Sequence, residues 1–83
     1  MQKNLLAEEV NYVSQDKLKP GSAVVCKIRY SDKGSQAEII SADENHFELR
    51  FNGQKSAITP GQSAVIYDEQ GYVLAGGIIK KGF

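Results

Sequence analysis

The stretch HFELRFN, residues 46–52, carries the clearest secondary-structure pattern in the chain. Phe47, Leu49 and Phe51 alternate with polar side chains, so in an extended segment they point to one face and the polar residues point to the other. A helix would scatter the same residues around its circumference, because its period is about 3.6 residues. The stretch therefore predicts a β-strand with one buried face and one hydrated face.

Similar apolar runs, rich in Val, Ile and Tyr, recur along the chain between short turn sequences that contain Gly, Pro, Asn or Asp. Short strands separated by regular turns are typical of β-sandwiches and β-barrels. No segment shows a convincing helical pattern. We therefore expect an all-β fold, a small six- to seven-stranded antiparallel barrel over residues 10–83, with residues 1–9 as a linker. The other expected strands cover residues 10–13, 23–30, 37–40, 63–67 and 72–79.

Length and composition limit what this domain can do. With 83 residues, the chain can bury only about 60–65% of its unfolded surface, which allows a single modest core. Ten basic residues balance ten acidic ones, so the net charge is zero; this argues against a domain that is basic all over, but it allows a local basic strip. No apolar run approaches the roughly 20 residues of a membrane span, and the first residues do not resemble a secretory signal. With one cysteine, no intrachain disulfide can form, and we expect a soluble, cytoplasmic domain.

The segment AITPGQSAVIYD, residues 57–68, contains a turn motif and no side chain suited to acid–base or nucleophilic chemistry. In Pro60-Gly61-Gln62, the proline presets φ and the glycine supplies the positive φ of a type II turn. The pair recurs at Pro20-Gly21, and we interpret the two as the same solution to the same corner rather than as a duplicated unit. Gly76-Gly77, inside an apolar strand, predicts a bend, a bulge or a close backbone approach.

Few side chains suggest reactive chemistry. His46 is the only histidine, and no further ligands stand at metal-site spacing, so we interpret it as a hydrated residue at a strand start. Cys26 shares the expected inner face with Val24 and Ile28, which makes it a core side chain. We predict no catalytic and no metal-binding residue. The acidic pairs are interpreted as solubility charges: Glu8-Glu9, Asp43-Glu44 and Asp68-Glu69.

The stretch CKIRY, residues 26–30, is the best candidate for a binding surface. Lys27 and Arg29 are expected on the hydrated face, about 7 Å apart, a separation at which two cations can engage successive phosphates. Tyr30 stands beside them, and Lys80, with its neighbour Lys81 and with Lys55, could extend the patch. The alternative is an ordinary hydrated strand face, or cations paired with acidic residues across the sheet, namely Glu38 or Glu48. The candidate RNA contacts are thus Lys27, Arg29, Tyr30 and Lys80.

Four motifs, taken together, resemble a known family. VNYV (residues 10–13), KIRY (27–30), AITPGQSAVIYD (57–68) and VLAGGII (73–79) follow the order and spacing of the C-terminal domain of the bacterial tRNA-uridine 2-sulfurtransferases, the MnmA/TrmU family. The resemblance extends over about residues 10–79. Two positions depart from the family pattern: Tyr12 stands where tryptophan is frequent, and Ala75 stands where a third glycine is common.

The resemblance implies a barrel like the second domain of elongation factor Tu. It also implies a parent enzyme that activates the wobble uridine of tRNA with ATP and Mg²⁺ and then transfers sulfur from a cysteine persulfide. The phosphate loop and the two catalytic cysteines of that enzyme lie in other domains, and Cys26 matches neither cysteine. The implied role is a non-catalytic domain that helps to position tRNA and packs against the catalytic domains. The alternative is a purely structural module without RNA contact, whereas an independent enzyme would need an interior cavity that the inward aromatic residues should fill.

Overall fold

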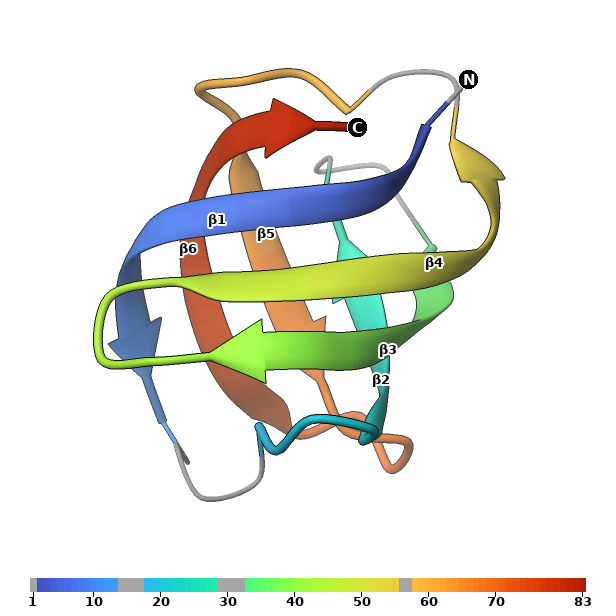
Figure 1. The fold of residues 1–83 in the computed structure, drawn as a ribbon. Helices are drawn as coiled ribbons and strands as arrows, with labels where there is room; N and C mark the ends of the chain where they lie inside the picture. Colours follow the sequence, from blue (N-terminus) through green and yellow to red (C-terminus); the bar gives the residue numbers. More distant parts are fainter. Residues whose placement is uncertain (1, 14–17, 29–32, 56–57) are drawn as a thin grey trace.

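The computed structural model describes residues 2–13, 18–28, 33–55 and 58–83, which form a closed β-barrel (Figure 1). The predicted all-β antiparallel barrel is confirmed, with six strands. The described residues contain no helix, and hence none long and apolar enough to cross a membrane. The strands are β1 (Gln2–Tyr12), β2 (Ala23–Lys27), β3 (Ser35–Ala42), β4 (Phe47–Lys55), β5 (Ser63–Tyr67) and β6 (Val73–Gly82).

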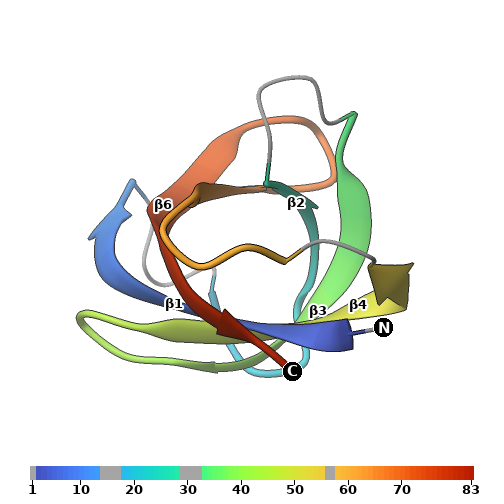
Figure 2. The same cartoon turned by 90° about the horizontal axis from the view of Figure 1, so that it is seen from above.

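The strands follow the order β1-β4-β3-β2-β5-β6 around the barrel, and β6 closes on β1. Figure 2 shows the resulting ring from above. Closure pairs both edges of each strand, so the barrel has no open edge for intermolecular pairing. Every pairing is antiparallel. One end of the barrel therefore gathers the starts of β1, β3 and β5 with the ends of β2, β4 and β6.

Apolar side chains fill the interior. The predicted inner face of β4 is confirmed, since Phe47, Leu49 and Phe51 are at most 1% exposed. The inward Val24, Cys26 and Ile28 are buried as expected, while the structure shows no buried polar or charged residue in the described part of the chain. The rest of the core is Leu5, Ala7, Val10, Leu18, Ala37, Ile39, Ile58, Ala64, Ile66, Leu74, Ala75 and Ile79.

The first strand begins earlier than expected, so the prediction of a linker over residues 1–9 is wrong for residues 2–9. Leu5 pairs with Leu49 of β4 and is fully buried. A bulge hides the strand pattern: the pairing with β6 shifts register between Glu8 and Asn11, and Glu9 has a positive φ of 52°. An extra residue in a bulge breaks period-two alternation, which is why Val10 lies on the inner face although its spacing from Leu5 is odd.

The other strand boundaries differ less. β5 occupies the predicted residues, while β3, β4 and β6 are longer than expected. β2 ends at Lys27, and the predicted continuation through Arg29 and Tyr30 lies outside the described residues.

The two Pro-Gly turns have the predicted geometry. Gly21 and Gly61 have φ values of 90° and 92°, and the residue after each donates its N–H to the carbonyl three positions earlier, at 3.0 and 3.3 Å. Each glycine N–H also bonds to the neighbouring strand, Gly21 to Ile39 O at 2.7 Å and Gly61 to Ile79 O at 2.8 Å. The first turn thus attaches the start of β2 to β3, and the second attaches the start of β5 to β6. The role of both turns is architectural.

Candidate nucleic-acid interface

Lys27 lies on the outer wall of β2, where the sequence placed it, but its partner is aromatic. Its Nζ atom is 4.9 Å from the ring centroid of Tyr67. In the pairing of β2 with β5, Lys27 lies opposite Val65. A lysine over a tyrosine ring gains a modest cation–π attraction. The structure therefore gives Lys27 a partner other than Glu38 or Glu48, and sequence reasoning did not single out Tyr67. Arg29 and Tyr30 lie outside the described residues.

Lys80 is not adjacent to Lys27 in register. In register, Lys27 lies opposite Val65, and Val65 lies opposite Gly76 on β6. Lys80 is four residues further along β6, a rise of about 13 Å. Both belong to the predicted RNA contacts; they lie on strands that β5 separates and are offset along them, each near its strand's terminus at the same end of the barrel.

Lys80 shares one end of the barrel with lysines of β1 and β4. Lys81 is opposite Leu6, Lys55 is opposite Gln2, and Lys3 donates its backbone N–H to Phe83 O at 3.3 Å. We call this end of the barrel, where β1 starts and β4 and β6 end, the basic end (Figure 1). The described terminal stretches at this end contain no Asp or Glu; they are residues 2–4, 27–28, 33–36, 53–55, 58–62 and 79–83.

The lysines of the basic end form no ion pair with another described residue. In the described ranges, the structure records one ion pair, between His46 and Asp43 at the opposite end. Aromatic rings approach two of the amines instead: Lys55 Nζ is 5.4 Å from the centroid of Phe51, and Lys81 Nζ is 5.0 Å from that of Phe83. These amines therefore keep their charge available for an anionic partner.

The opposite end is acidic. Strand direction brings together there the end of β1 and the β3–β4 and β5–β6 turns. Lys19 is the one lysine or arginine in the described stretches at that end. Although the net charge of the chain is zero, the described basic and acidic residues therefore concentrate at opposite ends of the barrel. The acidic residues are Glu9, Asp43, Glu44, Asp68 and Glu69.

Two of these carboxylates organise turns, so the interpretation as simple solubility charges was incomplete. Asp43 Oδ1 accepts the N–H groups of Asn45 and His46 at 2.9 and 2.8 Å. Asp68 Oδ1 likewise accepts the N–H groups of Gln70 and Tyr72, both at 2.9 Å. Such side-chain bonds replace the hydrogen bonds that a strand ladder would supply.

Asp43 should make stability depend on acid pH. The N–H groups of Asn45 and then His46 hold the pKa of its carboxyl below the ordinary value of 3.8. A lowered folded-state pKa adds stability above the unfolded pKa, and that stability is lost as the pH falls through the folded pKa. We expect urea unfolding at pH 7 to show wild type more stable than Asp43→Ala, with a smaller difference at about pH 2.5. An equal difference at both pH values would contradict this.

Tyr12 closes the same turn from β1. Its hydroxyl donates to the backbone oxygens of Asp43, at 2.5 Å, and of His46, at 3.2 Å. Burial, and secondarily the Asp43 charge, raise the pKa of Tyr12. The hydroxyl of Tyr12 thus connects β1 to the β3–β4 turn. The family that the chain resembles often has tryptophan at this position, which is also an aromatic residue with a hydrogen-bond donor.

His46 and Cys26, the side chains considered for reactive chemistry, lie in surroundings that indicate structural roles. His46 is 43% exposed at its side chain, with Nδ1 3.3 Å from Asp43 Oδ1. Cys26 is fully buried in the core. Within the part of the chain that the structure describes, no group of three His, Cys, Asp or Glu side chains is arranged to hold a metal ion.

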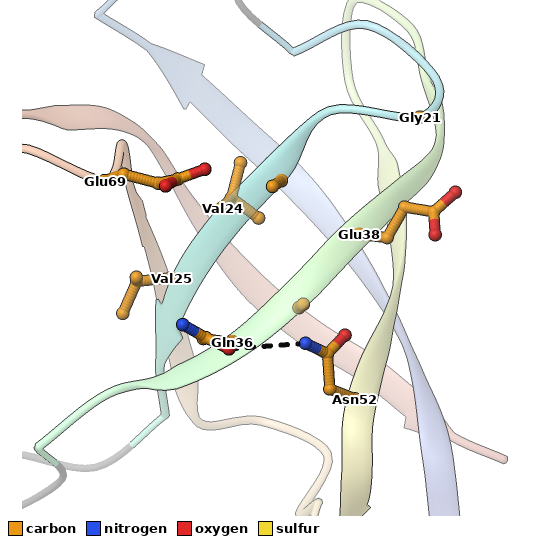
Figure 3. Close-up of a pocket in the computed structure, with 9 residues that line it drawn as sticks. Gly21, Val24, Val25, Gln36, Glu38, Asn52 and Glu69 are labelled. Atoms are coloured by element: carbon orange, nitrogen blue, oxygen red, sulfur yellow. Dashed lines mark hydrogen bonds between the residues drawn. The ribbon is translucent and has the colours of Figure 1, made fainter.

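A hollow of about 300 Å³ lies on the outer wall, across β2, β3 and β4 (Figure 3). The amides of Gln36 and Asn52 meet at 3.4 Å along one side. Glu38 and Glu69 are the charged residues among its described lining, which contains neither lysine nor arginine. This chemistry does not suit a phosphate, so the hollow is not part of the candidate interface.

Comparison with known proteins identifies related sequences. The family model of the "Aminomethyltransferase beta-barrel domain" matches residues 2–79. The tRNA-specific 2-thiouridylase MnmA of Halothermothrix orenii is 42% identical over 98% of the chain, and that of Clostridioides difficile strain 630 is 44% identical over 95%. The tRNA-specific 2-thiouridylase MnmA 2 of Clostridium botulinum strain Langeland is 42% identical over 94%.

The chain spans 22% of the length of each of these relatives. The predicted resemblance to the C-terminal domain of this family is confirmed, and the match begins at residue 2, as the early start of β1 requires.

Proposed function

Because the chain belongs to the family of the aminomethyltransferase beta-barrel domain, we propose that it is the non-catalytic C-terminal barrel of a tRNA 2-thiouridylase. In this role it helps to position tRNA and packs against the catalytic domains of the same enzyme, in the cytoplasm. The observation that carries the proposal is the match of the whole barrel to relatives whose names specify tRNA thiolation.

The chemistry of the barrel supports a non-catalytic role. Its interior is packed with apolar side chains, and the single thiol, Cys26, is closed off from solvent. We propose that activation of the uridine with ATP and Mg²⁺ takes place in other domains of the parent enzyme. The described part of the barrel offers no cluster of three metal-ligating side chains.

A role in tRNA positioning is supported by basic residues for which the described part of the chain shows no ion pair. Lys80 and Lys81 are exposed at the basic end, and Lys27 stands on the outer wall beside Tyr67. Phosphate contacts of this kind fix the register and orientation of a nucleic acid without reading its sequence. This is what a domain needs if it holds a substrate whose reactive base lies elsewhere.

A purely structural module is the second candidate, and one observation favours it. Val13, Tyr72 and Val73 are 74%, 72% and 41% exposed, and they are neighbours because Val13 N–H bonds to Leu74 O at 2.8 Å. Exposed apolar groups that adjoin one another are typical of a protein contact. They lie at the acidic end, away from the lysines, so both roles can coexist on one barrel.

Deleting the matching barrel from the Halothermothrix orenii thiouridylase separates the two roles. If the barrel positions tRNA, the truncated enzyme stays folded and its KM for tRNA rises by about tenfold or more, because binding contacts are lost and the chemical machinery is retained. Circular dichroism and steady-state thiolation assays measure the two properties. Loss of folding would favour the structural module, whereas an unchanged KM in a folded enzyme would contradict tRNA positioning.

A further inference from the structure

We propose that the basic end is the surface through which the barrel binds the phosphate backbone of RNA, with the acidic end directed away from it. The inference rests on the proposed function and adds the surface and its orientation. The residues that define it are Lys3, Lys55, Lys80 and Lys81, with Phe83 among them.

The charges change sign along the sequence in step with the strands. Because neighbouring strands are antiparallel, charges at alternate turns fall at the same end of the barrel. A chain with zero net charge thereby acquires a basic end and an acidic end. Near the described strand ends the order is Lys3, Glu8-Glu9, Lys27 with Lys33, Asp43-Glu44, Lys55, Asp68-Glu69 and Lys80-Lys81; Lys19 departs from it, and Glu38, Glu48 and Arg50 lie within strands β3 and β4.

The lysines are separated along and across the strands rather than gathered at one point. Lys55 lies opposite Gln2, and Lys81 lies opposite Leu6, four residues further along β1. That offset is about 13 Å along the strand. A row of separated cations suits a chain of phosphates better than it suits a single anion. The carboxylate of Glu48 approaches the row, since it accepts a hydrogen bond from Asn4 at 3.4 Å.

An exposed aromatic ring favours RNA over an acidic protein. Phe83 is 49% exposed, yet its backbone is fixed, because its N–H bonds to Asn4 O and its carbonyl accepts the Asn4 N–H, both at 2.9 Å. Unpaired bases stack on aromatic side chains beside cationic grooves, and this stacking contributes about 1–3 kcal/mol per base. Together with the lysines, the ring offers contacts for both parts of a nucleotide.

Charge reversal at matched positions tests the surface. Lys80→Glu at the basic end and Lys19→Glu at the acidic end change the net charge equally, and both side chains are exposed. The 83-residue chain is titrated at low salt with a short RNA stem-loop and followed by amide chemical shifts in ¹⁵N-labelled protein. We expect shifts at Asn4, Lys55 and residues 80–83. We also expect Lys80→Glu to weaken binding about tenfold and to flatten its salt dependence, while Lys19→Glu changes it less than twofold.

The outcomes separate this inference from the proposed function. Binding with shifts at the acidic end, or equal losses in the two variants, would overturn the surface but leave RNA contact standing. A folded chain that shows no shift at low salt would overturn both this surface and direct RNA contact by the barrel. Displacement of the RNA by polyglutamate at equal charge concentration would identify the basic end as a site for acidic protein instead. Unfolding curves of both variants confirm that the comparison concerns folded protein.

Discussion

Replacing Phe47 by alanine is expected to lower the free energy of unfolding by about 3–5 kcal/mol. Phe47 is fully buried and is among the largest side chains of the core. Its partners in register are small, Ala7 on β1 and Ala42 on β3, so the ring occupies the space that these neighbours leave. Closed strands on both sides cannot easily collapse into the cavity, which should keep the cost near the upper part of the range.

Urea unfolding followed by circular dichroism measures this effect. With an m value of about 1 kcal/mol per molar urea for so short a chain, the midpoint should fall by about 3 M or more, and a marginally stable barrel would be largely unfolded in water. Tyr72→Ala is the control, because Tyr72 is 72% exposed and should cost less than about 0.5 kcal/mol. A loss below about 1 kcal/mol in Phe47→Ala would show that the core does not depend on this ring.

The fold could be predicted wherever side chains alternate without interruption. In β4 the period of two holds from Phe47 to Phe51, and the inner face follows directly from the sequence. In β1 the same rule fails at Glu9, where the bulge adds a residue and changes the face. Local sequence contains no clear signal for this bulge, because its partner, Gly77 of β6, is about 70 residues away along the chain.

The candidate interface was predictable only in part, for a similar reason. CKIRY presented its cations within one strand, so the sequence alone could single out Lys27. The basic end joins Lys3, Lys55 and Lys80, which meet only through the pairings of β1 with β4 and β6. The alternation of charge sign with strand direction was nevertheless present in the sequence, and combined with the predicted antiparallel topology it indicates two oppositely charged ends.

Gly77→Ala is expected to destabilise the barrel by about 1–3 kcal/mol, while Gly76→Ala should be neutral or slightly stabilising. A Cβ atom at Gly77 would lie 3.0 Å from Glu8 O, 3.0 Å from Val10 Cγ2 and 3.3 Å from Ala7 Cβ, all on the bulged part of β1. One of these atoms belongs to the backbone, so a side-chain rotation cannot relieve the contact. The close backbone approach predicted for the glycine pair is therefore confirmed at Gly77.

Gly76 provides the matched control for this substitution. Its nearest neighbour would be Ala64 O at 3.8 Å, an ordinary contact distance, and its φ is not positive. Alanine there reduces the conformational freedom of the unfolded chain without a steric cost, which favours the folded state by about 0.4–1 kcal/mol. The melting temperature should therefore fall in Gly77→Ala, whereas in Gly76→Ala it should rise slightly or stay unchanged. Equal shifts would mean that β1 and its bulge can move away from β6, and that closure of the barrel does not depend on a glycine at position 77.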